Sequence, residues 1–141
     1  MERTPLTPAE AQWVAVQVSV AVGLARAYTG DSEDLPTLAR LDKTWLSWQT
    51  DTSSTKADAN AVVNGLGIAF GRHLANSLGL DWAIVSDEYG TDLALYGDPG
   101  AVTFFPANMI SKRLGERQPI FTQLHRAATD GVTQLRAKIK P

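Results

Sequence analysis

The spacing of apolar residues changes at Gly79, and this change limits what the chain can fold into. Before Gly79 the apolar residues recur at helical spacing. After it they alternate as in strands, in the segments 81–87, 91–97 and 101–105. Turn residues separate these segments, which predicts a three-stranded antiparallel β-meander. We therefore expect an α+β fold, with helices packed on this meander in the order α-α-α-β-β-β-α-α.

Helix start and stop signals give the expected limits of the helices. Thr7 and Glu10 form a capping box around Pro8, which predicts a first helix from about residue 7. Pro36 opens a second helix, and a third is expected from about residue 56 to residue 78. We expect one domain over residues 1–141, with a helical part at about 7–78, the meander at about 81–106 and C-terminal helices at about 107–139.

The stretch "NGLGIAFGR" at 64–72 contains three glycines, and they have two interpretations. A phosphate-binding turn needs glycines directly after a strand and at the start of a helix, and no strand precedes these. On a helix, Gly67, Gly71 and Ala75 instead form a stripe of small residues at four-residue spacing. A mid-helix glycine costs up to about 1 kcal/mol relative to alanine. We therefore expect neighbouring elements to pack closely on this stripe, with the third helix at the centre of the fold.

Composition removes several classes of chemistry. The chain has 141 residues, a net charge of −2 and no cysteine, which excludes disulfides, thiolate metal sites and cysteine nucleophiles. It lacks a long apolar run and a signal-peptide pattern, so we expect a cytoplasmic protein that binds no membrane. The residue spacings predict neither a metal site nor a cofactor.

Positive charge gathers near the C-terminus. No Lys or Arg lies between Arg72 and Lys112, and seven follow, opposed only by Glu116 and Asp130. This distribution is compatible with weak nucleic-acid binding through the last helix. The bases are spread out and lack interleaved aromatic residues, which favours a solvated helix face instead. The seven bases are Lys112, Arg113, Arg117, Arg126, Arg136, Lys138 and Lys140.

Three residues are the candidates for catalysis. His73 shares its helical angle with Val62 and Leu66, which places an ionisable ring on the apolar face of the third helix. A pocket between this helix and the hairpin would bring His73 to Asp87 and Glu88, as a general base oriented by a carboxylate. The other interpretation of His73 is a neutral ring held by one hydrogen bond. No established nucleophile motif accompanies these residues.

The hairpin around Gly90 provides the candidates for binding. In "SDEYGTD", Gly90 can take a positive φ and Asp87 can accept from nearby backbone N–H groups, which leaves Asp87, Glu88 and Tyr89 at an exposed tip. Both faces of the meander are partly apolar, so either helices cover the second face or it forms a ligand pocket or a dimer interface. The candidate binding residues are Tyr89, Tyr96, Phe105, Lys112 and Arg113.

A longer pattern runs through the middle of the chain. It consists of a glycine-containing helix, a Trp-bearing strand, Asp-Glu-x-Gly-Thr at the turn, Phe-Pro after the third strand and Lys-Arg beyond it. The matching residues are Gly67, Gly71, Trp82, Asp87, Glu88, Gly90, Thr91, Phe105, Pro106, Lys112 and Arg113. Over about residues 61–135 this pattern resembles a bacterial family of small proteins with a domain of unknown function, number 3806. The resemblance implies an α+β domain and brings no established catalytic residues.

These observations favour a noncatalytic binding or protein-interaction module, with self-association through a sheet or helix surface as one form of interaction. A small enzyme or ligand-binding domain at His73, Asp87 and Glu88 is the alternative. Weak nucleic-acid binding through the basic C-terminal helix is the third hypothesis.

Overall fold

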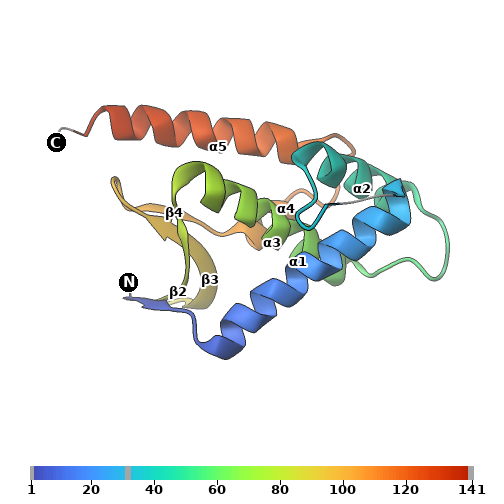
Figure 1. Cartoon of the computed structure of the whole chain (residues 1–141), viewed down its shortest axis with the longest axis horizontal. Coiled ribbons are helices and arrows are strands. Elements are labelled where there is room, and N and C mark those ends of the chain that lie inside the picture. The colour runs from blue at the N-terminus through green and yellow to red at the C-terminus, as the bar shows by residue number, and fades with distance from the viewer. Residues whose placement is uncertain (1, 31–32, 140–141) are drawn as a thin grey trace.

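The computed structural model describes residues 2–30 and 33–139 of the chain (Figure 1). It confirms the α+β class. In the view of Figure 1 the sheet lies at the left, α2 lies at the right, and α1, α3 and α5 extend between them. The elements of the described part are β1 (Glu2–Pro5), α1 (Pro8–Thr29), α2 (Leu38–Thr50), α3 (Ala59–Leu78), β2 (Asp81–Asp87), β3 (Gly90–Gly97), β4 (Val102–Phe104), α4 (Pro106–Ser111) and α5 (Ile120–Ala137).

The predicted capping box begins α1. The backbone N–H of Glu10 donates to Oγ1 of Thr7 at 3.2 Å, and the N–H of Thr7 donates to Oε1 of Glu10 at 2.8 Å. Gly30 ends the helix with a φ of 89°, and its N–H donates to the carbonyl of Arg26. Among the described residues, no helix combines the length and the apolar character that crossing a bilayer requires.

The next two helices start slightly later than expected, because their side-chain caps lie beyond the predicted starts. Thr37 caps α2, so the helix begins after it rather than at Pro36. Asp58 caps α3 by accepting from the N–H of Ala61 at 2.9 Å, so residues 56–58 precede the helix. The predicted stop at Gly79 is confirmed, with a left-handed φ of 66°.

The glycines of α3 allow close packing, as expected. A Cβ atom added to Gly67 would lie 3.0 Å from the Cα of Ala107 in α4, and one added to Gly71 would lie 2.6 Å from the Trp82 ring in β2. A Cβ contact at 2.6 Å essentially never occurs in proteins, and one at 3.0 Å would push its neighbour away by a few tenths of an ångström. These neighbours therefore pack closely where glycine leaves room. The helix also contacts α1, α2 and α5, which confirms its central position.

The sheet has four strands, which corrects the predicted three-stranded meander. Its order is β1-β2-β3-β4 with antiparallel pairing throughout, and the element order of the described chain begins with a strand. β1 pairs with β2 in a register that places Thr4 opposite Ile84. The sequence of β1 carries no apolar alternation and all four residues are exposed, so no local signal predicted it.

One face of the sheet joins the hydrophobic core. Trp82, Leu95 and Phe104 are paired across three strands on this face and pack with the buried helix residues. On the opposite face, the Arg3 guanidinium of β1 lies 3.3 Å from the centroid of the Tyr96 ring. The added strand therefore contributes a side chain that covers part of the second face, for which helices, a ligand pocket or a dimer interface were the expected alternatives.

Candidate functional site

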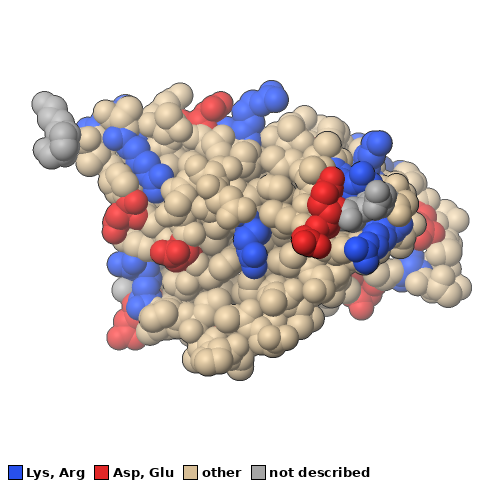
Figure 2. Space-filling view, viewed as in Figure 1, with Lys and Arg blue, Asp and Glu red and all other residues tan. Residues whose placement is uncertain are grey.

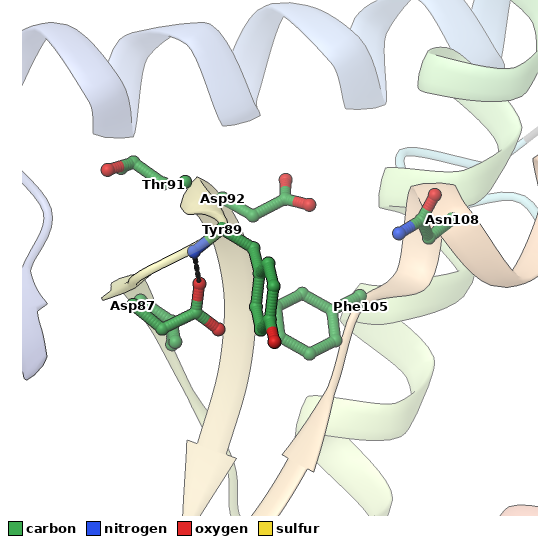
Figure 3. Close-up of a pocket in the computed structure, with 8 residues that line it drawn as sticks. Asp87, Tyr89, Thr91, Asp92, Phe105 and Asn108 are labelled. Carbon is green, nitrogen blue, oxygen red and sulfur yellow. Dashed lines mark hydrogen bonds between the residues drawn. The ribbon is translucent and has the colours of Figure 1, made fainter. Parts of the chain in front are cut away.

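A hollow of about 240 Å³ lies beside the β2–β3 hairpin, and we call it the hairpin hollow (Figure 3). The strands and their turn form one wall, and the start of α4 forms the other. In Figure 3 the Asp87 carboxylate lies on one side of the Tyr89 ring, and Asp92 and Asn108 lie on the other side. The lining residues are Val85, Asp87, Tyr89, Gly90, Thr91, Asp92, Phe105 and Asn108.

Turn chemistry holds the first wall in place. Asp87 Oδ1 accepts from the backbone N–H of Tyr89 at 2.8 Å, and Gly90 has a φ of 139°, as the sequence predicts for this tip. The hydroxyls of Ser86 and Thr91 lie 3.0 Å apart across the two strands. The tip is therefore a well-formed turn that presents the Tyr89 side chain, which is 89% exposed.

Helix packing holds the second wall in place. Phe105 immediately precedes α4, and Pro106 follows it at the first position of that helix. The Cγ of Pro106 would lie 2.8 Å from a Cβ added to Gly71, so the Pro106 ring packs on α3 where the glycine leaves room. Asn108 lies one turn further along α4 and completes the wall.

The hollow is negatively charged. Asp87 and Asp92 line it, none of its described lining residues is a Lys or Arg, and Glu88 sits in the turn between its strands. Neither lining carboxylate forms a salt bridge with another described residue. Asp92 Oδ1 accepts from the N–H of Leu93 at 2.9 Å, which leaves its other oxygen available as an acceptor. The hollow therefore combines free carboxylate oxygens with the rings of Tyr89 and Phe105.

His73, which the sequence grouped with Asp87 and Glu88, is not among the residues that line this hollow. The ring Nε2 of His73 lies 2.7 Å from the Pro36 carbonyl, in the segment that precedes α2. No α3 residue lines the hollow. In geometric terms His73 matches its other interpretation, a ring held by one hydrogen bond.

A second histidine lies near His73, although no sequence spacing links the two. Nε2 of His125 in α5 lies 2.9 Å from the Ser77 hydroxyl in α3. Burial lowers the pKa of His125 below its usual range, and the charge of His73 lowers it further. The contact between His125 and Ser77 therefore joins α5 to α3.

The remaining predicted binding residues lie in different places. Phe105 and Tyr89 line the hairpin hollow, whereas Tyr96 lies under Arg3 on the second face of the sheet. Arg113 donates to the carbonyl of Met109 at 2.8 Å and lies 3.7 Å from Glu116. Lys112 is exposed at the end of α4 and does not line the hollow.

On the face of the molecule that Figure 2 shows, Lys and Arg side chains are interspersed with Asp and Glu. Arg136 donates to the carbonyls of Leu78 and Pro99, so its guanidinium joins α5 to the end of α3 and to the loop between β3 and β4. Lys140 lies outside the described residues.

Asp92 and Asn108 are among the lining residues that sequence reasoning did not select as candidates. Asp92 ends the hairpin stretch "SDEYGTD", but its place in one hollow with Asn108 arises from strand pairing and from the packing of α4. Within residues 2–30 and 33–139, no group of three or more His, Asp or Glu side chains is arranged to hold a metal ion.

The comparison with known proteins gives one match. A family model described as "Domain of unknown function (DUF3806)" matches residues 42–122, more than half of the chain. Its first and last matched residues touch in the fold, because Asp42 accepts hydrogen bonds from Thr122. Neither a curated protein nor a solved structure matches the chain.

Proposed function

This chain belongs to the DUF3806 family, and from the chemistry of the hairpin hollow we propose that it is a noncatalytic binding module for a positively charged group. The group is an ammonium or a guanidinium, presented by a lysine or arginine side chain of a partner protein.

One observation carries the proposal: two carboxylates that form no salt bridge with another described residue line the same hollow as two aromatic rings. A cation in this position gains Coulomb attraction from Asp87 and Asp92, and a guanidinium also forms hydrogen bonds with carboxylate oxygens. The faces of Tyr89 and Phe105 attract a cation through their ring quadrupoles. A neutral or anionic ligand gains neither term.

The size of the hollow supports the choice of a side chain over a cofactor. Sites for drug-sized ligands and cofactors usually measure about 300–1,000 Å³. The hairpin hollow, at about 240 Å³, is smaller. A lysine or arginine side chain is attached to a partner protein, so the hollow has to hold only the charged end of that side chain.

The proposal is tested by NMR titration of the backbone amides of Gly90 and Thr91. The ligands are N-acetyl-arginine amide, N-acetyl-lysine amide and the uncharged analogue N-acetyl-citrulline amide. We expect saturable shifts with the two cations, weakened by added salt, and none with citrulline.

Substitutions then identify the groups that bind. Asp92→Asn and Phe105→Leu each weaken binding about two- to fivefold, the range for exposed ion pairs and cation–π contacts. Asp130→Asn, which removes one exposed carboxylate from α5, is the charge-matched control and leaves binding unchanged. Equal shifts with citrulline, or equal loss in Asp130→Asn, would exclude a cation site in this hollow.

A further inference from the structure

Strand β4 ends before it has covered the outer edge of β3. β3 comprises Gly90–Gly97, and β4 pairs only with residues 95–97 of it. The chain then leaves the sheet, because Pro106 begins α4. β1 pairs with β2 on the other side of the sheet, so no strand of the described chain lies beside the first half of β3.

The pairing of the hairpin shows which backbone groups of this edge point outward. Asp87 and Gly90 close a two-residue turn, which makes them a hydrogen-bonded pair. Such pairs alternate with non-hydrogen-bonded pairs along antiparallel strands, so Thr91 and Leu93 direct their N–H and C=O groups away from β2. The N–H of Leu93 agrees with this direction, because its acceptor is the side chain of Asp92 and not a carbonyl of β2.

The hairpin hollow lies where a further strand would continue the line of β4. Thr91 and Asp92 line it from the open half of β3, and Phe105 and Asn108 line it from the start of α4. In Figure 3 Asp92 and Asn108 lie on opposite sides of this space. Thr91 and Asp92 are both exposed, so a partner can reach the edge from solvent. The carboxylates of the hollow and the open backbone edge are therefore parts of one surface.

We propose that the hairpin hollow binds its cationic residue within an extended segment of a partner protein, which adds to the sheet as an antiparallel strand beside Thr91 and Leu93. The inference rests on the proposed cation site and specifies the backbone conformation of its ligand. In such strand addition, main-chain hydrogen bonds give affinity, and pockets for alternate side chains give specificity.

The backbone geometry places the basic residue of the segment opposite Asp92. The residues opposite Thr91 and Leu93 form the hydrogen-bonded pairs, so the residue between them faces Asp92 in a non-hydrogen-bonded pair. Directly opposite residues present their side chains on the same face of the sheet. A carbonyl of the added strand also accepts from the N–H of Leu93, which releases Asp92 Oδ1 for the cation.

The charge of the edge favours a basic segment over a second copy of the same edge. In an isologous antiparallel pair, each contact occurs twice, so Asp87 and Asp92 of both copies would lie along one short stretch. Like charges opposite each other on a sheet are destabilising. A segment with a central lysine or arginine instead places opposite charges face to face.

Peptides with methylated backbone nitrogens test the pairing. The parent probe is acetyl-Thr-Val-Arg-Val-Thr-amide, and NMR follows the amides of Thr91 and Leu93. N-methylation of both valines blocks the nitrogens that face β3, whereas N-methylation of the arginine changes a nitrogen that faces away. We expect the parent and the N-methyl-arginine peptide to bind at least about tenfold more tightly than N-acetyl-arginine amide. The N-methyl-valine peptide should lose this gain.

Equal affinity of the two methylated peptides overturns strand addition, as do shifts at the outer edge of β1 or β4 in place of Thr91 and Leu93. Shifts of these two amides that grow with protein concentration in the absence of peptide assign the edge to a second copy and also overturn it.

A parent peptide with citrulline in place of arginine separates this inference from the cation site. If the citrulline peptide binds as tightly as the parent and is equally sensitive to valine methylation, strand addition holds and the cation site is excluded. If N-acetyl-arginine amide binds and the parent peptide binds no more tightly, the cation site holds and strand addition is overturned.

Discussion

Oδ1 of Asp42 accepts a hydrogen bond from the backbone N–H of Phe121 at 2.7 Å, across 79 positions of the chain. The N–H and the hydroxyl of Thr122 donate to the other carboxylate oxygen. Pro119 stands at the N-cap of α5 and provides no side-chain acceptor. Asp42 in α2 therefore caps α5 from a distance, and its negative charge lies at the positive end of that helix.

Removing this cap should destabilise the protein. Asp42 is only 6% exposed, so Asp42→Ala leaves two backbone N–H groups of α5 without their acceptor. We expect the free energy of unfolding, measured in urea, to fall by about 2–3 kcal/mol. Asp130→Ala, at an exposed position of α5, should change it by less than about 0.5 kcal/mol. Similar values for both variants would contradict the capping role.

The space at Gly71 predicts an unusual response to alanine. Gly71→Ala improves helix propensity by up to about 1 kcal/mol, yet its Cβ would lie 2.6 Å from Trp82 and 2.8 Å from Pro106. We expect a net loss of about 1–3 kcal/mol in the free energy of unfolding, because overpacking outweighs propensity. Gly131→Ala has open space around its Cβ and should gain stability instead. If Gly71→Ala also gains stability, the close packing of β2 and α4 on α3 is refuted.

The α3–α5 contact should weaken in acid. Burial and the charge of His73 lower the pKa of His125, so the folded chain binds a proton there less readily than the unfolded chain does. The contribution of His125 to stability is full above the unfolded pKa of about 6.5 and is lost as the pH falls through the lower folded value. His125→Gln should therefore flatten the decline of unfolding free energy in this window. If the free energy of unfolding of His125→Gln declines in acid as it does in the unmodified chain, His125 is not the cause of that decline.

Alkaline pH should act through Tyr28. Burial, the hydrogen bond to Asp51 and the charge of Asp51 raise the pKa of Tyr28 to about 12, and the hydroxyl lies 2.6 Å from Asp51 Oδ2. The folded chain favours the protonated phenol of Tyr28. The contribution of this phenol to stability is therefore present below about pH 10, the ordinary tyrosine pKa, and is lost as the pH rises toward the pKa in the folded chain. Tyr28→Phe should remove the last phenolate transition in an ultraviolet titration. Tyr89→Phe, at an exposed ring, is the control and should leave that transition in place.

The hydrogen bond from Tyr28 also lowers the pKa of Asp51, as the largest of several causes. The contribution of the ionised Asp51 carboxylate to stability is present above the ordinary carboxyl pKa. It is lost as the pH falls through the lower pKa that Asp51 has in the folded chain. In Tyr28→Phe the pKa of Asp51 should therefore rise, which a carboxylate titration by NMR detects. An unchanged Asp51 pKa would contradict the contact.

The sequence by itself determined the features that depend on neighbours a few residues apart. The capping box at Thr7, the stop at Gly79 and the alternation of β2 and β3 were all predicted, because helix caps, turns and strand faces are local. The family resemblance and the packing role of the α3 glycines were predicted as well.

Only the tertiary structure decided the relations between distant residues. β1 has no apolar pattern and becomes a strand because the edge of β2 offers its backbone partners. Asp42 caps α5 because α2 packs beside the start of that helix. The His73 ring contacts the Pro36 carbonyl, which directly precedes α2. Asp92 and Asn108 share a hollow because α4 is held against Gly67 and Gly71. Such contacts depend on how complete elements pack, and that information is spread over the whole chain rather than carried by any short segment of it.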